Sequence, residues 1–365
     1  MKRGVVTILS VDGGGVRGII PALVVRDLMR RIHVLREWSR APLRAFVPFP
    51  KNLMPRRRKP RPVRSAAEVF DIFAGTSTGA LVTLGLARAG NSSPEEIIRF
   101  YRERASEIFP PSRFSASGTV RQAFTVKYDQ EPLERVFQEV FGDERLGECR
   151  SNVLIAAYDT DHRSPFFFKH YTQRVCRRNP VLCREAAEYR DFFLRDVARA
   201  TTAAPTFFEP SRITATDGKQ YTLVDGALAA NNPALSAYVE ARKLYRDARR
   251  YIIVSIGTGR STRQFPWETI RRWGYLDWVS PLHGVPLNAM FSDGQSETVA
   301  HALKQLPRVT YFRFNADIPD SVSEEIDDAR PESIAALESM GRDLIRRHAG
   351  ELHRLARLLY RHRLF

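Results

Sequence analysis

The chain alternates between short apolar runs and longer segments in which apolar residues recur every three or four positions. The short runs predict buried strands at 5–11, 69–74, 152–158, 165–171, 221–224 and 251–256. The helical spacing predicts helices at 21–35, 80–89, 94–108, 192–202 and 233–245. Ser93 and Glu96 form the pattern of a capping box at the start of the third helix. Because strands and helices alternate, we expect an α/β fold with a mostly parallel central sheet and helices on both faces.

Two segments depart from this alternation. Residues 36–64 contain ten lysines and arginines, six prolines and a single acid, Glu37, which predicts a basic surface insertion. Residues 333–365 mix leucines with arginines and predict a basic C-terminal helix. We expect its leucines to pack on the domain, with a membrane-surface helix as the alternative. Since no repeat or linker interrupts the chain, we predict one domain over residues 1–365.

Composition adds a packed core and a positive charge to this picture. Hydrophobic residues make up 43% of the chain, and its formal net charge is +16. Such an excess favours an anionic partner, which could be nucleic acid, a nucleotide ligand or an acidic membrane surface, although a solvated basic face explains it equally well. Three cysteines, Cys149, Cys176 and Cys183, suggest neither a disulfide framework nor a zinc site and fit a reducing cytoplasm. No apolar stretch approaches the ~20 residues that span a bilayer.

The first predicted strand leads into the stretch "VDGGGVRGII" at 11–20, which allows two interpretations. Gly13, Gly15 and Gly18 satisfy the G-x-G-x-x-G pattern of a dinucleotide-binding turn. That interpretation also needs an acid at the end of a second strand, but Glu37 follows a helix and lies in the basic insertion. The alternative is a loop whose backbone N–H groups receive a negative charge that forms during a reaction.

A second loop, "GTSTG" at 75–79, fits the pattern G-x-S-x-G. It lies between a predicted strand and a predicted helix, the context that places a nucleophilic serine, here Ser77, on a sharp turn. Gly75 and Gly79 have no side chains, which would otherwise collide in such a turn. The alternative is a plain turn without chemistry.

A nucleophilic serine needs a base, and Asp225 is the better candidate. None of the eight histidines follows a late strand, where a hydrolase triad would place one. Asp225 follows the strand at 221–224 and precedes Gly226. Since the carboxyl ends of parallel strands share one sheet edge, we expect Asp225 to lie near Ser77. An ordinary Asp-Gly turn is the alternative.

These positions together favour the second interpretation of the glycine loop. Acyl transfer by Ser77 passes through a tetrahedral oxyanion, which needs fixed N–H donors. Gly13, Gly14 and Gly15 can turn successive N–H groups into one concavity, because no Cβ obstructs the bend.

The motifs resemble the patatin-like phospholipase family, over most of the chain and in the same order. The matching stretches are "DGGGVRG" at 12–18, "GTSTG" at 75–79, "ATTAAPTFFEP" at 200–210, "DGA" at 225–227, "NNP" at 231–233 and "SIGTG" at 255–259. The segment 273–306 is similar to one found in bacterial members. The long basic tract at 36–64 departs from the plant storage forms.

The resemblance implies a three-layer α/β/α fold and a metal-independent lipid acyl hydrolase without a cofactor. It implies that Ser77 and Asp225 form a catalytic dyad and that the glycine loop holds the oxyanion. Arg17 would assist the oxyanion or, alternatively, pair with a carboxylate for structure.

The resemblance also implies partners and a place of action. We expect a membrane glycerophospholipid as substrate, in the cytoplasm at the inner membrane face, with the basic tract on anionic headgroups or a phosphate-bearing ligand. Activation by a cyclic oligonucleotide in antiphage defence is a further expectation, and a homo-oligomer is left open. The rival interpretation is a non-catalytic nucleotide- or lipid-binding module.

Overall fold

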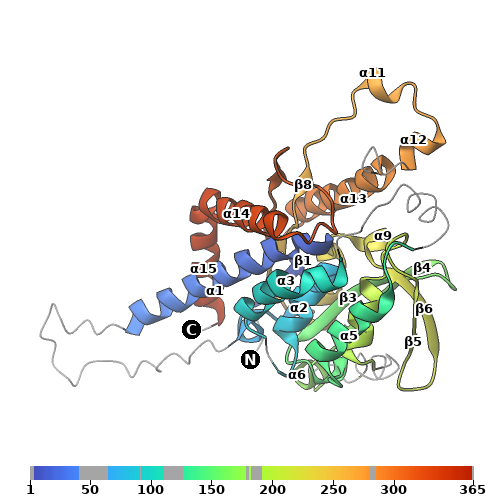
Figure 1. Cartoon of the computed structure of the whole chain (residues 1–365). Coiled ribbons are helices and arrows are strands. Elements are labelled where there is room, and N and C mark those ends of the chain that lie inside the picture. The colour runs from blue at the N-terminus through green and yellow to red at the C-terminus, as the bar shows by residue number, and fades with distance from the viewer. Residues whose placement is uncertain are drawn as a thin grey trace, which may run out of the picture.

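A single eight-stranded sheet organises the fold (Figure 1). The computed structural model describes residues 4–40, 65–90, 92–110, 126–177, 181, 191–279 and 285–363. Most of the predicted basic insertion, from residue 41 to 64, lies outside the described residues.

The sheet combines a parallel centre with antiparallel strands at one side. The parallel strands are β1 (Val5–Val11), β2 (Ile72–Thr76), β3 (Asn152–Asp159), β7 (Arg250–Ile256) and β9 (Val309–Phe314). The antiparallel strands are β4 (Ser164–His170), β5 (Ser211–Thr214) and β6 (Gln220–Asp225). Two short strands, β8 (Arg260–Ser261) and β10 (Asp317–Ile318), pair separately. The α/β fold with a mostly parallel sheet is therefore confirmed.

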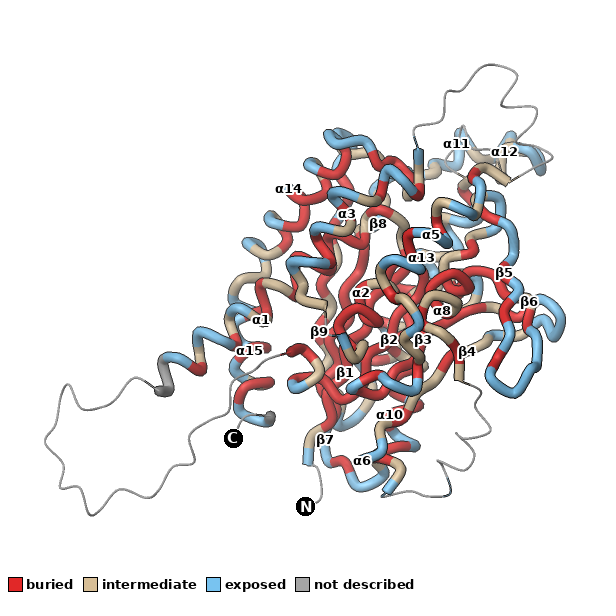
Figure 2. The backbone as a smooth tube through the Cα atoms, turned by 60° about the horizontal axis from the view of Figure 1, so that its bottom comes forward, coloured by how far each residue is buried: buried red, intermediate tan, exposed pale blue. Residues whose placement is uncertain are grey.

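Helices cover both faces of the sheet because its strands alternate their apolar side chains between the two faces. Leu9 and Val11 pack with a layer of helices on one face, and Val6 and Ile8 with a smaller layer on the other. The larger layer contains α1 (Ile19–Arg40), α2 (Thr78–Ala87), α3 (Pro94–Ile108), α5 (Gln130–Phe141), α8 (Leu194–Thr201), α14 (Pro331–Arg347) and α15 (Ala349–Arg363). The smaller layer contains α6 (Gln173–Cys176), α10 (Ala234–Leu244) and α13 (Pro286–Gln305). Figure 2 shows the strands and the inner helix sides as buried, which agrees with the expected three layers.

Several short helical elements complete the described part of the chain. They are α9 (Ala227–Ala230), α11 (Trp267–Ile270), α12 (Tyr275–Val279) and the 3-10 turns η1 (Gly15–Gly18), η3 (Ala66–Glu68) and η4 (Leu146–Glu148). The capping box of α3 is present, since the Glu96 amide donates to the Ser93 hydroxyl at 3.2 Å and the Ser93 amide donates to Glu96 at 2.6 Å.

Most predicted boundaries lie within three residues of those in the structure, and two helical segments differ more. Helix α1 continues to Arg40, five residues beyond the predicted end at 35, and so includes the first residues of the predicted insertion. The predicted single helix at 333–365 is two helices, which meet at His348. Leu352, Leu355 and Leu359 of α15 are buried, so this helix packs its leucines on the domain.

The register of β3 explains how two distant segments meet. Strand β4 runs along one edge of β3, so β2 and β6 must share the other edge. There Thr76 of β2 pairs with Ala156, and Asp225 of β6 pairs with the next residue, Ala157. Because β2 is parallel and β6 antiparallel to β3, the two strands run toward each other and meet end to end. The sequence-based reason, two parallel strands ending at one edge, was wrong, although the proximity that it predicted is found.

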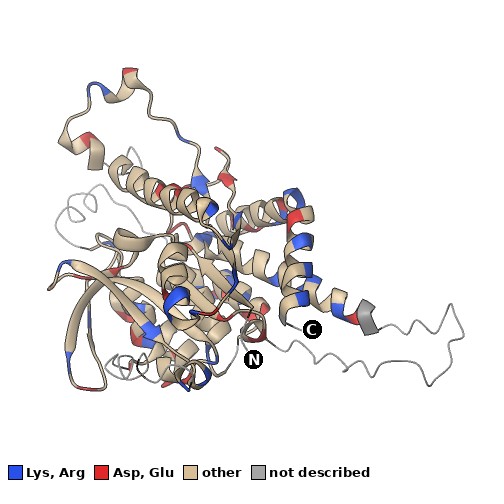
Figure 3. Ribbon diagram, turned by 180° about the vertical axis from the view of Figure 1, so that it is seen from behind, with Lys and Arg blue, Asp and Glu red and all other residues tan. Residues whose placement is uncertain are grey.

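The structure also shows where the basic residues lie, which cysteines are bonded and whether a described helix could cross a membrane. Lysines and arginines recur along α1, α14 and α15 (Figure 3). Cys149 is free and buried, whereas Cys176 is disulfide-bonded, which the interpretation of the three cysteines did not foresee. In the described part of the chain, no helix has the length and apolar character to cross a bilayer.

Candidate active site

Ser77 lies on the sharp turn between β2 and α2. Its φ of 52° is positive, a conformation that a residue with a Cβ adopts only when the surrounding structure enforces it. Gly79 permits the turn, because a Cβ there would lie 2.6 Å from the carbonyl oxygen of Asp12. Gly75 is equally enclosed, since its Cβ would lie 2.5 Å from the carbonyl oxygen of Gly79. The Ser77 amide donates to the Thr201 hydroxyl at 2.9 Å, which fixes the turn.

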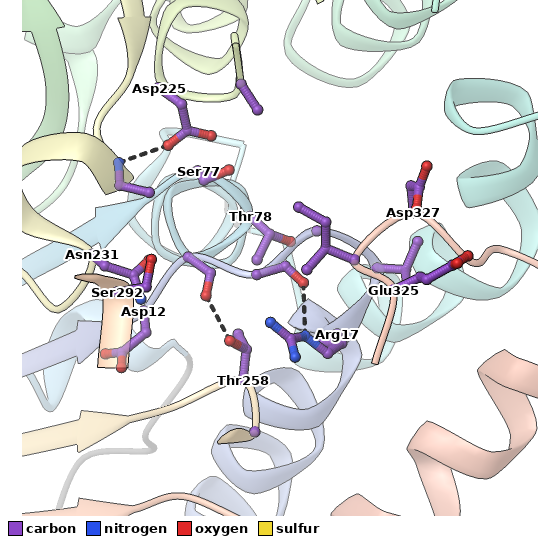
Figure 4. A pocket seen from close by; sticks show the side chains of 18 of the residues that line it. Asp12, Arg17, Ser77, Thr78, Asp225, Asn231, Thr258, Ser292, Glu325 and Asp327 are labelled. Atoms are coloured by element: carbon purple, nitrogen blue, oxygen red, sulfur yellow. Dashed lines mark hydrogen bonds between the residues drawn. The ribbon is translucent and has the colours of Figure 1, made fainter. Parts of the chain in front are cut away.

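Asp225 lies beside Ser77, with its carboxylate buried at the end of β6 (Figure 4). One carboxylate oxygen accepts a 2.8 Å hydrogen bond from the amide of Ala227. Burial raises the pKa of Asp225 to about 6, while the Ser77 hydroxyl and the Ala227 amide oppose that rise. Gly226 leaves room for this chain path, because a Cβ there would lie 2.8 Å from the Cβ of Ala156. A carboxylate with a pKa near neutrality is a better general base than an exposed one.

The glycine loop after β1 runs past Ser77, and its carbonyl groups are held on the side away from that residue (Figure 4). The Gly13 carbonyl accepts a 2.6 Å hydrogen bond from the Thr258 hydroxyl. The Gly14 carbonyl accepts from the amide and Nε of Arg17, at 3.2 and 3.4 Å. In a trans peptide the following N–H points opposite to the carbonyl. The N–H groups of Gly14 and Gly15 are therefore directed away from Thr258 and Arg17.

The predicted donors of the loop differ in their availability. The Gly13 amide already donates to the carbonyl of Asn231, at 3.2 Å. Among the described residues, the amides of Gly14 and Gly15 donate to no protein acceptor. Gly15 has a φ of 58°, and a Cβ there would collide with the backbone of Ile326. Two amides of the glycine loop thus remain available to an acceptor that enters the site.

Arg17 is directed at the Gly14 carbonyl rather than at Ser77 (Figure 4). Within the described part of the chain it forms no direct ion pair, but Asp293 and Glu324 oppose the lowering of its pKa by burial, so the structural role beside a carboxylate stays an alternative. Its contact fixes the peptide that carries the Gly15 amide.

Asp12, which precedes the glycines, is paired with Arg313 of β9. Two hydrogen bonds of 3.0 and 2.6 Å join the guanidinium to the carboxylate, and Arg313 also donates to the Ser255 hydroxyl at 2.9 Å. Asp12 is 3% exposed, so this buried pair holds the loop to the sheet. Sequence reasoning missed Arg313, because it did not recognise the strand 309–314, where one arginine stands in an apolar run.

Ser77 and Asp225 open onto a cavity of about 1100 Å³. One wall is apolar and comes from α2, α3, α5 and the loop after α8: Leu81, Phe100, Ala105, Ile108, Phe109, Leu133, Phe137, Phe207 and Phe208. Charged residues line the cavity as well: Arg17, Lys127, Arg260, Arg263, Asp293, Glu297, Asp317, Glu324, Glu325 and Asp327. Carboxylates outnumber cations among these ten residues, so the positive charge of the chain is not concentrated there. No histidine of the described residues lines the cavity.

Comparison with known proteins finds relatives that match most of this chain, including the segments that form the candidate site. A family model described as "Patatin-like phospholipase" matches residues 9–238. "Patatin-like protein 2" of Arabidopsis thaliana is 29% identical over 94% of this chain and 83% of its own length. "Probable inactive patatin-3-Kuras 1" of Solanum tuberosum is 27% identical over 95% of this chain and 88% of its own. The crystal structure of VipD from Legionella pneumophila covers 95% of this chain and 67% of that chain at 11% identity, with a TM-score of 0.36, too low to support an argument.

Proposed function

Because this chain belongs to the patatin-like phospholipase family, a family of lipid acyl hydrolases, we propose that Ser77 and Asp225 are its catalytic dyad. The proposed reaction cleaves the carboxylic esters of membrane glycerophospholipids and releases fatty acids. The observation that carries this proposal is the meeting of β2 and β6 along β3, which brings the hydroxyl beside a buried carboxylate.

The proposed reaction has two stages. Ser77 attacks the ester carbonyl while Asp225 accepts the hydroxyl proton, and the amides of Gly14 and Gly15 bind the oxyanion. Collapse of this intermediate breaks the ester C–O bond, and Asp225 returns the proton to the departing alcohol. Water, deprotonated by Asp225, then attacks the acyl-Ser77 ester. As the bond between the acyl carbon and the Ser77 oxygen breaks, Asp225 returns the proton to that oxygen and the fatty acid is released.

The shape of the cavity supports a lipid ester as substrate. Its apolar wall, which includes Phe100, Phe137 and Phe208, offers an environment for an acyl chain. The charged residues that also line the cavity offer contacts to a polar headgroup. The alternative, a non-catalytic nucleotide- or lipid-binding module, does not account for a strained serine beside a carboxylate with a raised pKa.

Hydrolysis of a fluorogenic acyl ester separates these alternatives. We expect wild-type turnover, near-complete loss in Ser77→Ala, and a loss of about 10²–10⁴-fold in Asp225→Asn, which removes the base but keeps its shape. Ser106→Ala and Asp247→Asn alter the same residue types at exposed positions and should leave the rate unchanged. Undiminished turnover in Ser77→Ala would falsify the dyad.

The place of action and the activating signal stay predictions from the resemblance. We predict reaction at the cytoplasmic face of the inner membrane, and activation by a cyclic oligonucleotide. Adding a panel of cyclic di- and trinucleotides to the purified protein should raise the esterase rate with at least one of them. An unchanged rate with every member would count against this activation.

A further inference from the structure

Exposed apolar side chains are concentrated in one part of the described chain. Of the ten exposed large apolar residues among those that the structure describes, six lie between 267 and 291: Trp267, Tyr275, Leu276, Leu287, Met290 and Phe291. We call residues 263–279, together with the start of α13 at 285–291, the aromatic arm. Figure 1 shows α11 and α12 of this arm on a segment that extends away from the sheet. A concentration of exposed apolar surface of this kind is typical of an interaction site.

The aromatic arm is held together by its own side chains. The ring of Trp273 contacts Phe265 and Trp278, with centroid distances of 5.7 and 5.1 Å. The guanidinium of Arg271 lies 4.8 Å from the ring centroid of Trp267. These contacts leave other groups outside the cluster, since Tyr275 is 80% exposed.

Helix α13 connects this surface to the candidate active site. Leu287, Met290 and Phe291 follow the spacing i, i+3, i+4 and so form one exposed apolar face of the helix. Asn288 follows Leu287 directly and Ser292 follows Phe291 directly, and both line the cavity that contains Ser77. The apolar face and the cavity are therefore adjacent on one helix.

We propose that the aromatic arm docks the protein on a lipid bilayer and brings the cavity to the lipid. Tryptophan and tyrosine favour the membrane–water interface, because their rings are apolar at one end and polar at the other. The arm also exposes three arginines: Arg271 pairs with Glu268 at 3.0 Å, whereas Arg263 and Arg272 suit anionic headgroups. This docking role rests on the proposed function, in which the substrate is a membrane lipid.

The described structure favours the aromatic arm over α15 as the membrane contact. The leucines of α15 are buried against the domain, so this helix presents no apolar face for insertion. The cavity also opens beside α13 and not beside α15.

Vesicle binding tests the proposal without catalysis. The Ser77→Ala protein is mixed with vesicles of phosphatidylcholine and phosphatidylglycerol, and bound protein is measured by flotation. Adding Trp267→Ser, Tyr275→Ser and Leu276→Ser should weaken binding by about tenfold or more, because the inserted apolar area is lost. The matched control, Val34→Ser with Val239→Ser, removes exposed apolar side chains from α1 and α10 and should bind as before.

Tryptophan fluorescence gives a second readout. Three of the four tryptophans of the chain, Trp267, Trp273 and Trp278, belong to the aromatic arm. Vesicles should shift their emission to the blue, and brominated lipid should quench it. The triple serine variant retains Trp273 and Trp278 and should lose both effects.

The outcomes separate the docking role from the hydrolase itself. The triple serine variant with Ser77 intact should hydrolyse a water-soluble short-chain ester at the wild-type rate but lose vesicle lipid hydrolysis. If the wild type cleaves no ester yet binds vesicles through the arm, the proposed function fails and the docking holds. Vesicle binding that survives the three substitutions overturns the docking. A dimer that is seen by light scattering and dissociates in the triple serine variant would also overturn the docking, because the arm would then contact a second copy of the chain.

Discussion

The Thr258 hydroxyl donates a 2.6 Å hydrogen bond to the Gly13 carbonyl, which lies 245 residues earlier in the chain. This bond fixes the peptide whose N–H, on Gly14, is proposed to bind the oxyanion. Thr258→Val keeps the shape of the side chain and removes the donor. We expect kcat to fall by about 10–100-fold and KM to stay unchanged. This loss is smaller than the ~10²–10³-fold loss of rate that follows deletion of an oxyanion donor itself, because the Gly14 amide is still present.

The serine variant provides the control for Thr258. Thr258→Ser retains the hydroxyl and should keep most of kcat, whereas a merely structural threonine would tolerate valine at least as well as serine. Steady-state kinetics on one soluble ester measures both. Equal kcat in Thr258→Val and wild type would show that the loop needs no such fixation.

The raised pKa of Asp225 predicts an acidic limb in the pH dependence of the reaction. A general base must be ionised, so kcat/KM should fall as the pH decreases through about 6, the pKa to which burial raises this carboxyl. A limb near pH 4 would show that the fold does not raise the pKa of this carboxylate. The residual activity of Asp225→Asn should show no limb near pH 6.

The same pKa predicts that Asp225 lowers the stability of the fold at neutral pH. Folding raises its pKa from 3.8 to about 6, so its favourable contribution is complete below about pH 4 and is lost as the pH rises through about 6. Asp225→Asn should therefore be more stable than wild type at pH 8, by up to about 3 kcal/mol. Urea unfolding at pH 8 and pH 4 checks this, because the gain should vanish at the lower pH. Asp247→Asn, an exposed control, should show no gain.

The sequence predicted much of the site because its chemistry is local. The strand–turn–helix context around Ser77 and the capping box at Ser93 depend on nearby residues, and the structure has both. The position of Asp225 was anticipated for a wrong reason, since no local pattern shows that β6 is antiparallel and meets β2 end to end.

Other parts of the site depend on contacts between distant segments. Thr258 lies in a recognised motif, "SIGTG", but nothing in those letters shows which carbonyl it binds. Arg313 was overlooked because β9 was not recognised. The prediction of Gly13 as a donor failed to foresee Asn231, whose carbonyl already accepts from it. Such pairings depend on tertiary packing, which composition and periodicity do not encode.

The buried pair of Asp12 and Arg313 predicts a large and asymmetric effect of mutation. Arg313→Met leaves the Asp12 carboxylate buried without its cation and should lower the free energy of unfolding by about 3–5 kcal/mol. Adding Asp12→Asn removes the stranded charge and should recover part of that loss. Chemical denaturation measures both, and Arg346→Met, which breaks an exposed pair with Asp343, should change stability by less than ~1 kcal/mol. A small loss in Arg313→Met would mean that water reaches the Asp12 carboxylate.

Gly79 and Gly85 lie in the same helix, α2, and predict opposite responses to alanine. A Cβ at Gly79 would meet backbone oxygens of Val11 and Asp12, which cannot move without shifting β1, so Gly79→Ala should lose the serine turn and nearly all esterase activity. A Cβ at Gly85 would lie 3.3 Å from the end of the Ile97 side chain, which can rotate. Gly85→Ala should therefore keep its activity and gain up to about 1 kcal/mol from helix propensity. Melting curves and ester turnover of the two variants test this, and an active Gly79→Ala protein would show that the close approach of α2 to β1 is not needed for the turn.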